Sequence, residues 1–114
     1  TEEKKQELVH AAEVVLAAAK AGVQVVSRAQ LDGAKKLLIA ADVNAVPPAG
    51  IEGVDVHADS VEIPGTSAFG IGALAIGNVK YKTEFNLFKR MIEPEKTVTL
   101  DFQDAFALAR TYVK

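Results

Sequence analysis

The sequence predicts an α/β fold in which helices cover a parallel sheet. Residues 37–43 (LLIAADV) form a continuous apolar run followed by Asn44 and Pro47-Pro48, a pattern typical of a central parallel strand. Alanine-rich and amphipathic segments supply the helices that such a strand needs on both of its faces. Hydrophobic residues make up 49% of the chain and charged residues 25%, which indicates a folded globular protein rather than a disordered one.

The composition excludes several classes of site. There is no cysteine, so disulfides, thiolate metal sites and cysteine nucleophiles are excluded. The net charge of −2, with lysines mixed among acids, argues against a nucleic-acid partner. No apolar run approaches the roughly 20 residues that span a bilayer and no signal-peptide pattern is seen, so we expect no membrane partner and a cytoplasmic protein. Because the chain opens on Thr1 inside a charged helical pattern, we also expect sequence upstream.

The first third of the chain allows two interpretations. Residues 2–8 are polar and favour a helix, and residues 11–19 continue either as one helix of about 20 residues ending at Gly22 or as a buried parallel strand. Periodicity does not decide between them. Residues 23–27 are ambiguous in the same way, and Asp32-Gly33 predicts a turn. Residues 45–65 are rich in proline and glycine and predict a long connection.

Two helices are predicted near the C-terminal end. The first starts at Tyr81, has Phe85, Phe88, Met91 and Ile92 at helical spacing, and is ended by Pro94. The second begins near Asp101, which is a good N-cap, and has Arg110 and Lys114 near its end, where they suit the helix dipole. Its predicted buried stripe consists of Phe102, Ala105, Phe106, Ala109 and Val113.

Three short patterns have chemical interpretations beside plainer ones. Gly70-x-Gly72-x-x-Ala75 matches a relaxed dinucleotide fingerprint, yet Pro64-Gly65 stands where a strand should precede it; the alternative is close packing of a glycine-rich segment. Asp55-x-His57-x-Asp59 has the spacing of metal ligands on a strand, but no second cluster completes a site, so a solvated edge is the plainer interpretation and we expect no metal. His10 is interpreted as a surface or partly buried histidine rather than a base.

Two places are better candidates for binding. Asp42 and Asn44 lie at the C-terminal end of the best strand, and ligands of open α/β sheets bind outside the carboxyl ends of strands. The alternative is a solvated Asp and a turn-forming Asn before the diproline. Lys80 and Lys82 lie between a glycine-rich entry and an amphipathic helix, where they either bind an anionic substrate or are ordinary surface lysines.

These two places also carry a resemblance to a known family. Residues 39–55 (IAADVNAVPPAGIEGVD) resemble a segment of the methylene-tetrahydromethanopterin dehydrogenases of methylotrophic and related bacteria. Residues 68–82, with their glycines and Lys80-x-Lys82, resemble that family's next block, and the order of motifs agrees through the terminal helix. The chain therefore looks like the C-terminal part of such an enzyme.

The resemblance implies a fold, a reaction and site residues. It implies a two-domain enzyme that transfers hydride between methylene-tetrahydromethanopterin or methylene-tetrahydrofolate and NADP. Residues 1–66 would be the C-terminal portion of a Rossmann-like NADP-binding domain, and residues 67–114 a helical segment packing toward the pterin-side domain. The resemblance also favours a strand at residues 12–18 and a short helix near 23–31, giving a partial Rossmann-like parallel sheet followed by two C-terminal helices.

The implied site has a cofactor side and a substrate side. Asp42 and Asn44 face the cofactor, Lys80 and Lys82 bind the pterin, and Lys80 is the catalytic candidate. The family's phosphate-binding glycine loop precedes the position of Thr1, so we expect the chain alone to be inactive. Its expected partners are the pterin substrate, the remainder of its own polypeptide and further copies in a homo-oligomer. The alternative is a stand-alone, non-enzymatic module that binds a ligand or oligomerises.

Overall fold

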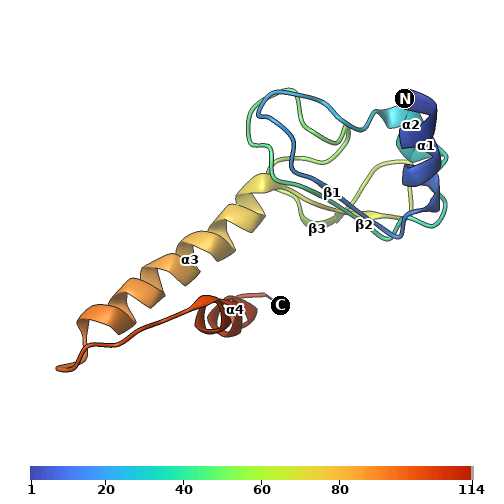
Figure 1. Cartoon of the computed structure of the whole chain (residues 1–114). Coiled ribbons are helices and arrows are strands. Elements are labelled where there is room, and N and C mark those ends of the chain that lie inside the picture. The colour runs from blue at the N-terminus through green and yellow to red at the C-terminus, as the bar shows by residue number, and fades with distance from the viewer. Residues whose placement is uncertain (114) are drawn as a thin grey trace. The chain divides into compact units, whose positions relative to one another are not determined.

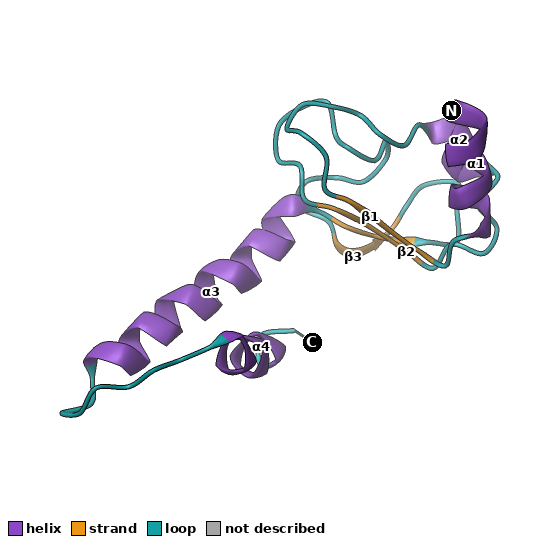
Figure 2. Cartoon of the chain, viewed as in Figure 1, coloured by secondary structure: helices purple, strands orange, loops and turns teal. Residues whose placement is uncertain are grey.

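The computed structural model describes residues 1–113, so Lys114 lies outside the described part of the chain. The chain forms two compact units, Thr1–Ile76 and Gly77–Lys114, which we describe separately. Figures 1 and 2 show the elements of both units. The helices are α1 (Glu2–Ala11), α2 (Arg28–Asp32), α3 (Ala73–Ile92) and α4 (Phe102–Arg110), and the strands are β1 (Val14–Ala17), β2 (Ile39–Asp42), β3 (Asp59–Glu62) and β4 (Phe69–Ile71).

The first unit is built on a four-stranded sheet of order β1-β2-β4-β3. Strand β2 is central and runs parallel to β1 on one side and to β4 on the other, as predicted for residues 37–43. Strand β3 is antiparallel to β4 and gives the predicted long connection at 45–65 a strand that its composition does not suggest. The predicted α/β class, a partial Rossmann-like parallel sheet followed by two C-terminal helices, is confirmed.

The structure resolves both ambiguities of the first third. Residues 14–17 form strand β1, so the strand interpretation of 12–18 is correct, and Thr1 caps the preceding helix by accepting the amide of Lys4 at 3.3 Å. The helix expected near 23–31 is shorter, because α2 starts only at Arg28. The amides of Val25 and Val26 instead donate to the carbonyl of Gly50, at 2.8 and 3.0 Å, which keeps this segment extended.

One face of the sheet carries the core. Ala17, Ala40 and Gly70, one from each of the three parallel strands, lie on this face. The largest fully buried side chains packed there are those of Leu31, Leu37, Ile51 and Ile63. Helix α1 adds Val9 and helix α2 adds Leu31, so both helices cover this face. Glu2 of α1 accepts the side-chain amide of Gln30 of α2, and Lys5 beside it lowers the pKa of the Glu2 carboxyl.

The opposite face is apolar and exposed, and we call it the open apolar face. Register places Val14, Ile39 and Phe69 side by side on it, with Leu16 next to Ala41 one step further along. Val14 is 60% exposed and Leu16 65% exposed. The prediction that helices cover both faces of the central strand therefore holds for one face of the described chain.

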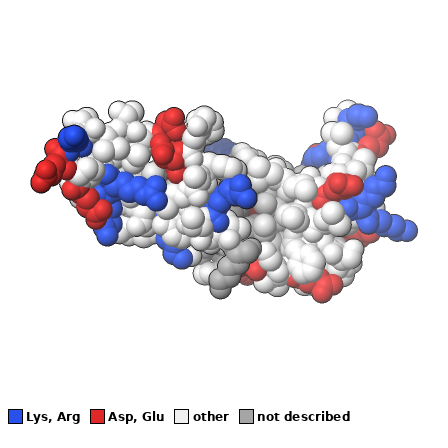
Figure 3. All heavy atoms as spheres, turned by 90° about the horizontal axis from the view of Figure 1, so that it is seen from below, with Lys and Arg blue, Asp and Glu red and all other residues white. Residues whose placement is uncertain are grey.

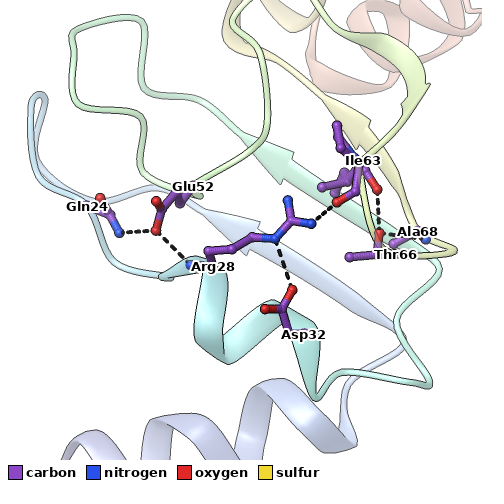
Figure 4. A network of polar contacts seen from close by, with 8 residues as sticks. Gln24, Arg28, Asp32, Glu52, Ile63, Thr66 and Ala68 are labelled. Carbon is purple, nitrogen blue, oxygen red and sulfur yellow. Dashed lines mark hydrogen bonds and ion pairs between the residues drawn. The ribbon is translucent and has the colours of Figure 1, made fainter.

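Arg28 links helix α2 to the turn at Glu52 and to the connection between β3 and β4 (Figure 4). Its guanidinium donates to Asp32 at 3.0 Å and to the carbonyl of Pro64, while its backbone amide donates to Glu52 at 2.8 Å. Glu52 also accepts the side chain of Gln24. This network explains the surroundings of Gly53 and Gly65, whose positive φ angles bring the chain close to the arginine head group.

The second unit contains most of α3 and all of α4. Helix α3 starts at Ala73, earlier than the predicted Tyr81, and ends at Ile92 before Pro94 as predicted. Helix α4 has Asp101 as its N-cap, accepting the amides of Gln103 and Asp104, which confirms that prediction. Its predicted buried stripe is wrong for the described chain, because Phe102 and Phe106 are exposed and Leu108 is the buried residue. The rings of Phe102 and Phe106 are 77% and 63% exposed, so the described residues leave most of both rings uncovered.

Candidate functional site

The candidate site is a cavity at the carboxyl ends of the central strands in the first unit. The cavity measures about 100 Å³ and lies between the loop that follows β2, the loop before β3 and the start of α3. Its lining is mostly apolar and consists of Asp42, Asn44, Ala45, Val46, Pro47, Ala49, Val54, Asp55, Val56, Gly72 and Ala73. The cavity therefore lies where ligands bind in open α/β sheets. Asp42 and Asn44, the predicted binding residues of the first unit, both line it.

Asp42 is the last residue of β2, and its carboxylate is turned inward. It is 2% exposed. Its Oδ1 accepts the backbone amide of Asn44 at 2.9 Å and its Oδ2 accepts that of Ile51 at 3.1 Å. A buried carboxylate requires such donors, and hydrogen bonds to a charged group are stronger than neutral ones. The interpretation of Asp42 as a solvated residue is therefore wrong.

Asn44 organises the following loop with both ends of its amide. Its Oδ1 accepts the backbone amides of Gly22 at 3.2 Å and Val46 at 2.9 Å. Its Nδ2 donates to the carbonyl of Pro48 at 2.8 Å. Asn44 is 8% exposed, so this is a buried side chain that fixes a turn, in agreement with the turn-forming interpretation.

The glycine pattern at 70–75 runs from the end of β4 into the first turn of α3. A strand is present there despite Pro64-Gly65, and Gly70 lies inside it rather than after it. However, the amide of Gly72 donates to Ala58 at 2.8 Å and that of Leu74 to Val56 at 2.9 Å, so these donors are already used. A β-carbon on Gly72 would lie 2.5 Å from the carbonyl oxygen of Val56 and closer still to that of Asp55. These contacts support close packing rather than phosphate binding.

The Asp55, His57 and Asp59 pattern forms a turn and the start of a strand. Asp55 accepts the amide of His57 at 2.8 Å, and Asp59 begins β3. Across residues 1–113, no group of three or more histidine and acidic side chains is placed to hold a metal. The ring of His10 packs against Gly33, and its buried Nε2 has no hydrogen-bond partner among the described atoms.

Lys80 and Lys82 lie on α3 in the second unit, so the geometry of the cavity includes neither of them. Lys80 is exposed, and its Nζ lies 3.7 Å from a carboxylate oxygen of Glu84, one turn further along the helix. Figure 3 shows basic and acidic side chains interleaved on the face drawn. In the part of the chain that is described, no helix has the length and apolar character needed to cross a membrane.

Sequence reasoning located Asp42 and Asn44 but missed the residues that complete this site. Gly50 is buried, and a β-carbon there would lie 2.7 Å from Oδ1 of Asp42. Val54 and Val56 line the same cavity as Val46 and Pro47 of the diproline loop. The signal available in the sequence was the Pro-Pro-Ala-Gly run itself, because a glycine that ends a tight loop marks a close approach of the backbone.

The fold and the site define a part of a Rossmann-like α/β protein with a small cavity of about 100 Å³ at the carboxyl edge of its sheet. Comparison with known proteins identifies two relatives that this chain resembles. The chain is 52% identical over 98 residues to the NAD(P)-dependent methylenetetrahydromethanopterin dehydrogenase of Methylorubrum extorquens, covering 86% of this chain and 33% of the relative. It is 32% identical over 106 residues to the bifunctional protein MdtA of the same organism, covering 93% of this chain and 36% of that relative.

The resemblance predicted from residues 39–55 and 68–82 is thus confirmed. The chain spans about a third of the length of the curated relatives it matches, which is consistent with the predicted C-terminal part of a longer enzyme. No family model matches the chain.

Proposed function

We propose that the chain is the C-terminal part of an oxidoreductase that transfers hydride between methylene-tetrahydromethanopterin or methylene-tetrahydrofolate and NADP. The observation that carries this proposal is the 52% identity to a relative whose name states an NAD(P)-dependent methylenetetrahydromethanopterin dehydrogenase. The segment 39–55 that carries the resemblance also supplies most of the residues that line the cavity. The proposed setting is cytoplasmic, one-carbon metabolism in a homo-oligomer.

The residues present suit one part of a nicotinamide cofactor. The apolar walls formed by Val46, Pro47, Val54 and Val56 suit a flat ring, whereas the amides of Gly72 and Leu74 in the glycine pattern donate to backbone carbonyls and are not available to its phosphates. Oxidised NADP bound there would supply the acceptor for the hydride that leaves the methylene carbon of the pterin. The chain's own contribution is to place the reacting partners and exclude water, and such positioning supplies a large part of the rate of hydride transfer.

We assign each candidate site residue to either the cofactor side or the pterin side of the proposed site. Asp42 and Asn44 belong to the cofactor side, at the carboxyl end of β2. Lys80 and Lys82 belong to the pterin side, where an ammonium group can donate hydrogen bonds to the pterin, and Lys80 is the catalytic candidate. Residues 1–66 then form the end of the cofactor domain, and residues 67–114 extend toward the pterin-side domain.

An assay of the full-length protein tests this proposal. We expect purified full-length enzyme to reduce NADP only when a methylene-pterin is supplied, as measured by the absorbance of the reduced nicotinamide, while residues 1–114 alone show no activity. Separate assays with the methanopterin and folate substrates, and with NAD in place of NADP, identify the preferred pair. A full-length protein that reduces neither nicotinamide with either pterin would contradict the proposal.

A non-enzymatic module is the second candidate function, and one observation favours it. The amides of Gly72 and Leu74 in the glycine pattern and the side chains of Asp42 and Asn44 have partners inside the protein. Under this alternative the chain binds a partner or a copy of itself without turnover. Titration of full-length protein with NADP separates the two, because only the dehydrogenase binds the cofactor saturably.

The open apolar face yields a prediction about the remainder of the polypeptide. We propose that the remainder of the enzyme packs against this face, because rows of exposed Val, Leu, Ile and Phe are uncommon on a monomer surface. Leu16→Lys should then destabilise the full-length enzyme by at least about 2 kcal/mol, since a buried Leu contributes that much and a buried charge costs more. The same change in residues 1–114 should be nearly neutral, because Leu16 is exposed there.

Urea unfolding of both proteins measures this difference. Ala29→Lys, at an exposed position on α2, is the matched control and should be neutral in both lengths. Equal destabilisation of Leu16→Lys in the two lengths would contradict the proposed packing.

A further inference from the structure

The loop between Asn44 and Gly50 forms one wall of the cavity, and two side chains fix its course. Asp42 accepts the amide of Asn44 at the start of the loop and that of Ile51 just after its end. Asn44 accepts the amide of Val46 inside the loop and donates to the carbonyl of Pro48. The loop is therefore held at its start, middle and end by side chains that originate at the carboxyl end of β2.

Gly50 provides the space in which the Asp42 carboxylate lies. A β-carbon at position 50 would be 2.7 Å from Oδ1 of Asp42 and 3.2 Å from its Cγ, closer than real side chains pack. The backbone of Gly50 has little freedom to move away, because its carbonyl accepts the amides of Val25 and Val26. A methyl group at position 50 and the carboxylate of Asp42 thus compete for the same space.

We propose that Asp42, Asn44 and Gly50 are positioning residues, which set the loop wall formed by Val46 and Pro47 and act on the reaction through it. The inference rests on the proposed function and refines it, since Asp42 and Asn44 then serve the cofactor side without touching the cofactor. Both oxygens of Asp42 and both polar atoms of Asn44 hold backbone partners, which supports an indirect role.

A double-mutant cycle in the full-length enzyme tests the proposal. Asp42→Ala and Gly50→Ala should each raise KM for NADP roughly 10- to 100-fold, because displacement of a site wall by about 1 Å has effects of that size. The double variant should be no worse than Asp42→Ala alone, because the new methyl group then occupies the space that the carboxylate left. Asp42→Asn, which retains one acceptor oxygen, should fall between wild type and Asp42→Ala.

Independent effects would instead multiply in the double variant, and that result would overturn the proposal. So would an unchanged KM for Gly50→Ala. A role in stability alone lowers the melting temperature of each variant without producing this non-additive pattern in KM.

Hydrogen exchange without any ligand separates this inference from the proposed function. The amides of Ile51 and Val46 should exchange faster in Asp42→Ala and Gly50→Ala than in wild type, whereas Asp59→Asn, at an exposed position on β3, should leave them unchanged. Unchanged exchange would overturn the positioning role whatever the activity. A wild-type enzyme that shows no NADP-dependent turnover would overturn the proposed function, and with it the effect of the loop on KM.

Discussion

Gly72→Ala should destabilise the chain by about 3 kcal/mol, near the upper end for overpacking a well-packed site. The β-carbon would lie 2.5 Å from the carbonyl oxygen of Val56 and nearer to that of Asp55, and both are backbone atoms that no rotamer change can move. The amide of Gly72 also donates to Ala58, so a shift that relieves the clash breaks a buried hydrogen bond. The free energy of unfolding from urea titration measures the effect.

Gly77→Ala is the matched control for this change. Gly77 lies within α3, and a β-carbon there would meet no atom within 4 Å. Alanine in place of a helical glycine should stabilise the chain by about 0.5–1 kcal/mol. If the two substitutions changed stability in the same direction, the close approach of the 55–56 backbone to Gly72 would be wrong.

These two glycines show what the sequence reveals about the fold. The spacing of Gly70, Gly72 and Gly77 predicted close packing, yet only contacts with residues 55 and 56 distinguish Gly72 from Gly77. Strand β4 was missed for a related reason: it is three residues long and contains Gly70, so it carries almost no strand pattern of its own. Its partner β2 was predicted because a continuous apolar run is a local signal.

The site could be located from the sequence but its hydrogen bonds could not. Asp42 and Asn44 lie at the carboxyl end of a predicted central strand. That position is enough to place them at the edge of the sheet where ligands bind in open α/β folds. Their roles depend on Ile51, nine residues beyond Asp42, and on Gly22, 22 residues before Asn44. The prediction that both faces of the sheet are buried was wrong for one face for a similar reason. The apolar side chains of β1 and β2 on that face stay exposed, because residues 1–76 supply nothing that covers them.

Lys80→Ala in the full-length enzyme should lower kcat/KM for the methylene-pterin about 100-fold and leave KM for NADP unchanged. Removing one group that donates to charge developing in a transition state typically costs this much. Folding should be unaffected, since the Lys80–Glu84 pair is exposed and its Nζ–Oε1 distance of 3.7 Å marks a weak surface interaction. Steady-state kinetics with each substrate varied in turn measures the separation.

Lys89 provides the control that makes this prediction specific. It lies on the same helix and forms an equivalent pair with Glu93, also at 3.7 Å and also exposed. Lys89→Ala removes the same charge and the same type of ion pair, so it should change kcat/KM by less than about twofold, as expected for a surface pair. Equal losses for both variants would reduce the role of Lys80 to net charge on α3, and no loss for either would remove Lys80 from the pterin side of the site.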